Sequence, residues 1–249
     1  MNGAVAVKRA IVFMVWGDKY VQHVADCVRE SALPDVPVYL LTDAESDISC
    51  LQSHVQVIRC DIRYAGKLAK LELMRNLPQD LEIVLFLDVD TRVIDDISLG
   101  FEKAEKYGIA MAPAPHYSLE HFRDFGQVMD REGVPRQGQL LYNSGVLFFD
   151  AHSEAIREVF RLACEIAERD ATTPWGDQTY ITLAMEILGV NPYTLSPSFN
   201  HRGFGEMVSG SVRVWHSYNP VPADAGNLEY GYLHRHENGA FVRALKVPK

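Results

Sequence analysis

The sequence has few cysteines, no surplus of basic residues and no long apolar run. It contains four cysteines in 249 residues, and none of them forms a CxxC pair. No stretch approaches the roughly 20 consecutive apolar residues that a membrane-spanning helix needs. With 24 Lys and Arg against 33 Asp and Glu, the formal charge is −9. Proteins bind nucleic acids and anionic lipids with a cationic surplus that this chain lacks. We therefore expect no nucleic-acid partner and no membrane span.

The cysteine usage and the N-terminal segment point to a reducing compartment. Four cysteines without a paired spacing are typical of small core residues, although Cys50 and Cys60 could form a bridge in an oxidising compartment. The apolar run at 10–16 is short for the hydrophobic part of a signal peptide, and no small-residue cleavage site follows it. A buried first strand and a cytoplasmic location are the expectation.

Apolar strands alternate with amphipathic helices along the first two thirds of the chain. This alternation predicts an α/β fold with a mostly parallel central sheet and helices on both faces. From Asn200 onward the composition shifts to Gly, Asn, His and Tyr, which predicts an irregular C-terminal wrap. The polar segment 113–142 is expected to be a lid or to carry a small helix at 119–129. The expected strands are 9–16, 36–41, 55–58, 83–87, 109–112 and 145–149, and the expected helices are 20–30, 66–75, 153–168 and 176–188.

The strongest local signal is an acid pair at the end of a buried strand. Asp88 and Asp90 follow the apolar run 83–87 in the segment LFLDVDT. A spacing of two on an extended backbone points both side chains the same way. Two carboxylates that close repel each other unless a cation lies between them, and their oxygens suit Mg²⁺ or Mn²⁺. A solvated turn is the alternative, but the buried strand favours a metal site.

Two further polar groups lie at element ends. Asn143 opens a strand in the segment NSG and could offer both a donor and an acceptor to a sugar hydroxyl, or could simply form a turn. Asp177 begins a helix in the segment GDQ and shares a face with apolar residues. Its carboxylate therefore either caps the helix or hydrogen-bonds a polar ligand.

Three other candidates are weaker on their own. The alternating segment VRVW predicts a strand that ends at His216, a surface residue or a third ligand for Mn²⁺. Tyr20 follows the first strand and could stack on a nucleobase, whereas packing at the helix entry is the better interpretation for Trp16. Lys67 and Lys70 lie three apart on one expected helix face, where either could reach a diphosphate or remain solvated.

Taken in order, these features resemble a nucleotide-diphospho-sugar transferase of the GT-A fold, nearest to glycosyltransferase family 8 and the glycogenin-like enzymes. The ordered set runs from Arg9 to Tyr218. The residues that carry the resemblance are Tyr20, Lys67, Asp88 and Asp90, Asn143 in NSG, Asp177 and Gln178 in GDQ, and His216.

The resemblance implies a single domain over 1–249, with 1–112 as its nucleotide-binding half and 113–249 as its acceptor half. It implies that a metal, Mn²⁺ or Mg²⁺, is held against a nucleotide-sugar diphosphate, usually of UDP. The sugar then moves to a hydroxyl acceptor, with retention at the anomeric carbon.

Residue roles follow from the same resemblance. The metal ligands are then Asp88, Asp90 and His216, and Tyr20 and Lys67 join the acid pair in binding the donor. The sugar is lined by the catalytic set Asn143, Asp177 and Gln178. The family's lysine after the histidine is missing here, because SYNP follows His216. Lys67 or Arg202 is expected to substitute for it.

Two other functions compete with this interpretation. A haloacid-dehalogenase-type phosphatase also uses an acid pair after an apolar strand, with Asp88 as nucleophile and Asp90 as acid/base. That motif normally lies near the N-terminus, whereas here it lies at mid-chain. A catalytically silent nucleotide-sugar-binding protein would keep the same fold and the same ligands.

Overall fold

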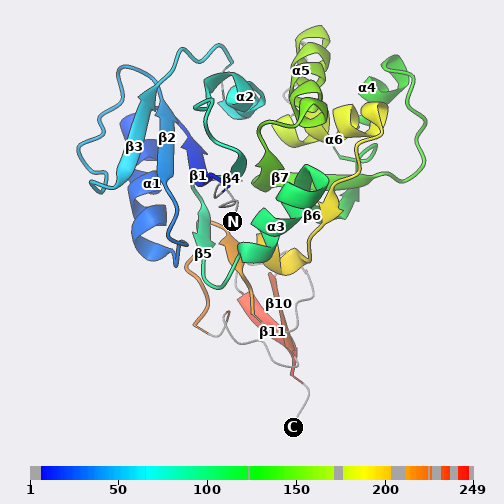
Figure 1. The fold of residues 1–249 in the computed structure, drawn as a ribbon. Coiled ribbons are helices and arrows are strands. Elements are labelled where there is room, and N and C mark those ends of the chain that lie inside the picture. The colour runs from blue at the N-terminus through cyan, green and yellow to red at the C-terminus, as the bar shows by residue number, and fades with distance from the viewer. Residues whose placement is uncertain are drawn as a thin grey trace, which may run out of the picture.

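A mixed β-sheet forms the centre of the molecule (Figure 1). The computed structural model describes residues 7–64, 66–122, 124–170, 176–202, 211–223, 225, 231–235 and 241–246. Within them, seven strands pair in the order β3-β2-β1-β4-β7-β6-β8. Only β7 runs against its neighbours β4 and β6; the other pairs are parallel. The strands are β1 (Arg9–Met14), β2 (Val38–Thr42), β3 (Val55–Arg59), β4 (Ile83–Leu87), β6 (Ile109–Ser118), β7 (Leu140–Asp150) and β8 (Tyr193–Thr194).

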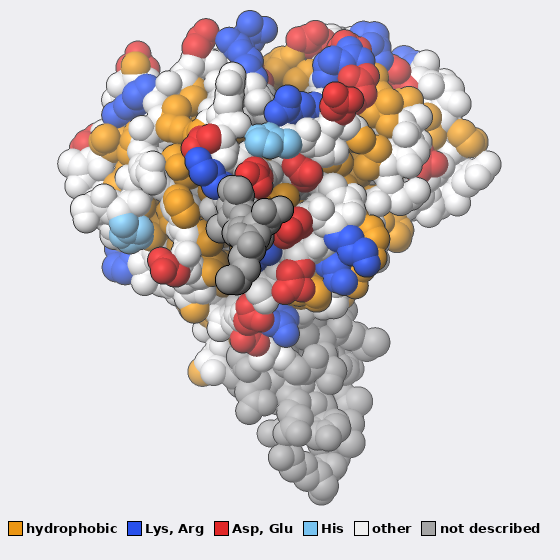
Figure 2. All heavy atoms as spheres, viewed as in Figure 1, with side chains coloured by type: hydrophobic (Ala, Val, Ile, Leu, Met, Phe, Trp, Pro, Cys, Tyr) orange, Lys and Arg blue, Asp and Glu red, His pale blue; other side chains and the backbone are white. Residues whose placement is uncertain are grey.

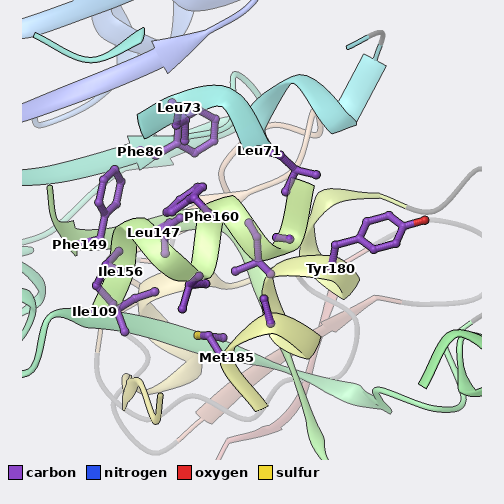
Figure 3. Packing of buried hydrophobic residues seen from close by; sticks show 14 of the residues in the cluster. Leu71, Leu73, Phe86, Ile109, Leu147, Phe149, Ile156, Phe160, Tyr180 and Met185 are labelled. Carbon is purple, nitrogen blue, oxygen red and sulfur yellow. The ribbon is translucent and has the colours of Figure 1, made fainter. Parts of the chain in front are cut away.

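Helices cover both faces of this sheet, as the sequence predicts. On one face α1 (Asp18–Glu30) and α3 (Ser98–Tyr107) pack through residues such as Val24 and Phe101. On the other face lie α5 (Glu154–Arg169) and α6 (Asp177–Leu188), with Phe160 and Tyr180 in the core (Figure 3). All five residues of β4 are buried, because a strand covered on both faces has no polar side.

The helix expected at 66–75 is divided in two. A 3₁₀ helix, η1 (Gly66–Glu72), leads into one α-helical turn, α2 (Leu73–Asn76). The segment buries Lys70 and Glu72 together with Leu71 and Leu73. The helical segment therefore lies where the sequence predicts it. Its first part, however, has the i→i+3 hydrogen bonds of a 3₁₀ helix, which is more tightly wound than an α-helix.

The segment 113–142 is more regular than expected. Strands β6 and β7 extend into it from both ends, and α4 (Gly126–Arg131) is shorter than the helix expected at 119–129. Helix α3 was not among the helices expected from the sequence. Its Gly100 lies so close to the Phe148 ring that an added Cβ would overlap the ring. The absence of a side chain therefore lets this helix pack directly on β7.

The C-terminal part is not wholly irregular. A short antiparallel ladder joins β5 (Thr91–Val93) to β9 (Val214–His216). The 3₁₀ helix η2 (Pro197–Asn200) precedes β9 in the chain. Two later strands, β10 (Gly231–Arg235) and β11 (Phe241–Lys246), form an antiparallel pair that projects from the rest of the molecule (Figure 1).

The four cysteines are free, and their burial differs from the expectation. Cys27 is buried, whereas Cys50 is exposed and Cys60 and Cys164 are intermediate. The prediction that the cysteines are small core residues is therefore confirmed for Cys27 and wrong for Cys50. Among the described residues, no helix is both long and apolar enough to cross a bilayer.

Candidate active site

The acid pair lies in the tight turn that connects β4 to β5. The Thr91 backbone N–H and its hydroxyl both donate to the Asp88 carbonyl, at 3.1 and 2.7 Å. The backbone at Asp90 therefore turns, where the sequence analysis assumed an extended chain. Both carboxylates nevertheless face the same imidazole, that of His216.

His216 reaches the acid pair through the β5–β9 ladder. Thr91 pairs with His216 in this ladder, so the imidazole lies next to the residue that follows Asp90. The His216 Nε2 atom is 3.3 Å from Asp90 Oδ1 and 3.8 Å from Asp88 Oδ2. Burial raises the pKa of Asp90, but the charged form of His216, which donates a hydrogen bond to this carboxylate, outweighs burial and holds that pKa below its usual value.

These three side chains fit a divalent cation. One ligand atom from each lies within 4.8 Å of the others, and two carboxylates with an imidazole form a donor set suited to Mn²⁺ or Mg²⁺. Gly145 on β7 makes room for them. A Cβ added there would overlap His216 Cε1 and lie 2.8 Å from Asp88 Oδ2. The cluster therefore depends on a residue without a side chain.

A buried lysine joins the acid pair to the start of α6. The Lys70 Nζ atom is 2.9 Å from Asp88 Oδ1 and 3.1 Å from Asp177 Oδ2. It also donates to the Ser144 carbonyl at 3.1 Å and lies 4.7 Å from the centre of the Phe86 ring. Burial lowers the pKa of Lys70, but the two carboxylates outweigh it and hold that pKa above its usual value. The ammonium group therefore stays charged and occupies one oxygen of Asp88, which leaves Oδ2 facing His216.

Asp177 does not cap its helix. It is the first residue of α6, and its buried carboxylate accepts a hydrogen bond from the Ser144 hydroxyl in addition to the Lys70 ion pair. Of the two alternatives left open by the sequence, the structure supports a side chain turned toward the site. Trp175, two residues earlier, lies outside the described residues.

Asn143 is buried inside β7 instead of in a turn before a strand. Its Oδ1 accepts from the Gly145 backbone N–H at 2.9 Å and from Asn200 Nδ2 at 2.8 Å. Its Nδ2 faces Gln178 Oε1 at 3.4 Å. The structure thus brings Asn143, Asp177 and Gln178 together beside the acid pair.

Comparison with known proteins supports the fold by structure alone. No protein-family model and no curated protein sequence matches this chain. The galactosyltransferase LgtC, solved with donor and acceptor sugar analogues, matches with a TM-score of 0.61 and 15% identity, over 85% of this chain and 87% of LgtC. Mouse xyloside xylosyltransferase 1 matches with a TM-score of 0.57 and 14% identity, over 85% of this chain and 99% of the enzyme. The glycosyltransferase GlyE of Streptococcus pneumoniae matches with a TM-score of 0.52 and 16% identity, over 79% of this chain and 47% of GlyE.

This chain has the GT-A fold. The matching structures are GT-A glycosyltransferases, and the resemblance to family 8 is compatible with them. At such low sequence identity the likeness establishes the fold, and the chemistry has to be inferred from the site itself. Ligands of open α/β sheets bind beyond the carboxyl ends of the parallel strands. In this GT-A fold, that edge is where β4 delivers the acid pair.

A cavity of about 670 Å³ opens beyond the ends of β1, β2 and β3. Trp16, Asp43 and Cys60, which follow these three strands, all line it, together with Arg59 and Tyr64. Trp16 packs against the hydrophobic core, the interpretation that the sequence favours, and it also lines this cavity. The cavity therefore lies at the carboxyl ends of these parallel strands, the edge at which open α/β sheets bind their ligands.

Tyr20 lies on α1 at the margin of the site and does not line that cavity. Its ring meets His23 edge-on at 5.9 Å, and His23 contacts the Tyr218 ring at 5.3 Å. Burial, with added repulsion from the charges of Asp90 and Asp88, raises the pKa of Tyr218 to about 12. The three rings of Tyr20, His23 and Tyr218 therefore form an aromatic group near the carboxylates of the acid pair.

The two lysines expected on one helix face have different surroundings. Lys67 is exposed, and its Cδ lies 3.5 Å from where a Cβ on Gly176 would be. Lys70, by contrast, is buried against the acid pair. Arg202, the other residue expected to replace the missing lysine, is half-buried beside the buried His201. The sequence analysis considered Lys70 but did not assign it to the site.

Asn200 is the site residue that the sequence analysis missed. It ends η2, is 2% exposed, and its Oδ1 lies 2.7 Å from His216 Nδ1. A lone Asn after an aromatic residue carries no sequence signal for this role.

Acidic side chains also gather near the middle of the face shown in Figure 2, and a bound cation would offset part of this negative charge.

Proposed function

We propose that this chain is a metal-dependent glycosyltransferase that uses a nucleotide sugar, foremost a UDP-sugar, and transfers the sugar to a hydroxyl acceptor with retention. One observation carries the proposal. Asp88, Asp90 and His216 converge within 4.8 Å at the carboxyl end of a central strand in a GT-A fold. Two of the matching structures are a galactosyltransferase and a xylosyltransferase, which supports sugar transfer as the chemistry.

The cation would be held by the two carboxylates and by His216 Nε2. When bound, it would act as a Lewis acid that neutralises charge on the departing diphosphate. The bond between the anomeric carbon and the diphosphate would break, a bond from this carbon to the acceptor oxygen would form, and the proton of the acceptor hydroxyl would pass to the departing diphosphate. Lys70 stays charged beside Asp88, so it adds a fixed positive charge next to the leaving group.

The remaining polar groups would bind and orient the donor. Asn143, Asp177 and Gln178 lie together and would hold the hydroxyls of the sugar, so that proximity supplies part of the rate. Tyr20 would stack on the base at the margin of the site. Lys67 is exposed near the start of α6 and would reach the diphosphate only from the solvent side.

The proposal is tested by calorimetric titration of UDP with and without Mn²⁺, followed by measurement of UDP release from UDP-sugars. We expect UDP to bind in a Mn²⁺-dependent way and the wild type to turn over a UDP-sugar. Asp90→Asn removes a metal ligand while it keeps the side-chain volume. It should lower metal-dependent turnover about 100-fold or more, with an unchanged circular dichroism spectrum.

Asp35→Asn is the matched control, because Asp35 is exposed in a bend far along the chain from the site residues. It should retain wild-type turnover. Full activity in Asp90→Asn would refute the metal role. Metal-dependent UDP binding without transfer would identify a silent binding protein, and phosphate release from small esters would identify a phosphatase.

A further inference from the structure

Asn200 is connected to three functional groups by a continuous chain of hydrogen bonds. The chain begins at the Gly145 backbone N–H, which can only donate and which bonds Asn143 Oδ1 at 2.9 Å. Asn143 Oδ1 also lies 2.8 Å from the Asn200 amide. Because Asn143 Oδ1 is an acceptor, the Asn200 atom facing it must be the donor, Nδ2. The Gly145 backbone N–H therefore fixes the orientation of the Asn143 side-chain amide and, through it, that of the Asn200 side-chain amide.

The orientation of Asn200 determines where the neutral His216 ring carries its proton. With Nδ2 turned to Asn143, the atom that faces the imidazole at 2.7 Å is Asn200 Oδ1, an acceptor. His216 Nδ1 must then donate, so the neutral ring is the Nδ1–H form and Nε2 bears a lone pair. That lone pair faces Asp90 Oδ1 and Asp88 Oδ2, at 3.3 and 3.8 Å.

The backbone holds Asn200 and His216 in this relation. The Arg213 N–H donates to the Ser198 carbonyl at 2.8 Å, and the His201 N–H donates to the Val214 carbonyl at 2.9 Å. The His216 N–H in turn donates to the His201 carbonyl at 2.9 Å. Three hydrogen bonds thus connect η2 and the residue after it to β9 and the residue before it, and the contact between the two side chains does not rely on flexible loops.

We infer that Asn200 is a positioning residue that holds His216 in the Nδ1–H form, so that Nε2 is ready to ligate a divalent cation. Without the side-chain oxygen of Asn200, the proton of the neutral His216 ring can move from Nδ1 to Nε2. There it would donate a hydrogen bond to the carboxylates of Asp88 and Asp90. A protonated Nε2 cannot ligate. The inference rests on the proposed function for its biological meaning, but the position of the ring proton can be measured in the protein alone.

The first test is a long-range ¹H–¹⁵N correlation spectrum of ¹⁵N-histidine-labelled, metal-free protein, recorded at a pH where the His216 ring is neutral. We expect the wild type to carry the proton on Nδ1. Asn200→Asp keeps an oxygen that accepts from Nδ1 and should retain this form. Asn200→Ala should move the proton wholly or partly to Nε2. A wild-type ring protonated on Nε2, or an Asn200→Ala spectrum identical to wild type, would overturn the inference.

The second test measures Mn²⁺ affinity calorimetrically in the presence of UDP. Asn200→Ala should bind Mn²⁺ about 10- to 100-fold more weakly, the range typical for loss of the partner that orients a ligating histidine. Asn200→Asp should retain most of the affinity. It should instead raise KM for the nucleotide sugar, because its carboxylate cannot donate to Asn143 Oδ1. Equal loss of Mn²⁺ affinity in both variants would indicate a merely structural role and would contradict the inference.

Asn191→Ala is the matched control, because Asn191 is an exposed asparagine close in the sequence. It should leave the spectrum of His216 and the Mn²⁺ affinity unchanged. The two proposals can fail separately. A wild type that carries the proton on Nδ1 but binds no Mn²⁺, with or without UDP, would overturn the proposed function, whereas the spectrum alone decides the position of the proton.

Discussion

At the scale of single residues, the site depends on charges buried in contact with each other. Lys70 is 8% exposed between Asp88 and the 3% exposed Asp177. A buried ion pair adds little net stability over an apolar substitute, but removing one partner leaves an uncompensated charge. Lys67, three residues earlier, is exposed and provides a comparison within the same 3₁₀ helix.

Lys70→Met should therefore lower the free energy of unfolding by about 3–5 kcal/mol. Lys67→Met should change it by less than about 0.5 kcal/mol. Urea denaturation monitored by fluorescence measures both. Adding Asp177→Asn to Lys70→Met should restore part of the loss, because the unpaired carboxylate is then gone. A double variant less stable than Lys70→Met would contradict this account.

The same ion pairs predict how stability changes at alkaline pH. The pKa of Lys70 is raised in the folded protein above its usual value of 10.5. Its contribution is therefore fully present below that value and is lost as the pH rises through the higher folded pKa. The free energy of unfolding of the wild type should fall more steeply above about pH 10.5 than that of Lys70→Met. Parallel curves for the two proteins would show that Lys70 is not the group responsible.

Gly145→Ala tests the space beside the acid pair. The new Cβ would displace His216 and crowd Asp88, at a cost of about 1–3 kcal/mol in stability. We expect Mn²⁺ affinity to fall by about tenfold or more, since the imidazole loses its position. Gly176→Ala is the control, because a Cβ there meets only Lys67 at an ordinary distance of 3.5 Å. Undiminished Mn²⁺ binding by Gly145→Ala would show that the cluster tolerates the displacement.

At the scale of elements, the sequence predicts what repeats along the chain and misses what depends on tertiary contacts. The buried strand β4 and the apolar stripe of α5 follow from patterns of apolar residues and are confirmed. The division of 66–76 into η1 and α2 could not be predicted, because apolar residues spaced by three fit either helix type. The role of Asn200 could not be predicted either, since it arises from backbone hydrogen bonds that connect Ser198 to Arg213 and His201 to β9.

The start of α5 gives a prediction at this scale. Ser153 lies just before the helix, and its hydroxyl accepts from the Ile156 backbone N–H. Ser153→Ala should lower stability by about 1 kcal/mol, whereas Ser153→Gly should cost only a few tenths. Thermal denaturation of the three proteins measures the difference. Mn²⁺ affinity should not change in either variant, and a change would mean that this cap influences the distant site.

At the scale of the whole molecule, ligand binding should stabilise the fold as a unit. The proposed cation would be held by the turn between β4 and β5 and by β9, so it would connect the sheet to the C-terminal part. UDP and Mn²⁺ at about 100 times their dissociation constants should add about 2.7 kcal/mol to the free energy of unfolding.

Chelation of the metal with EDTA should abolish this stabilisation, and Asp90→Asn should not show it. Differential scanning calorimetry with and without EDTA measures the effect. An equal upward shift of the melting temperature in EDTA would mean that UDP binds without the cation, and the metal role would then be lost.

The β5–β9 ladder also sets the order in which the site is completed. During synthesis, both carboxylates leave the ribosome long before His216 is made. A nascent chain in which the strands of the central sheet have formed still lacks His216. The cation would therefore gain its third protein ligand only after His216 has been made. Metal capture would thus join a part of the chain that is made early to a part that is made later.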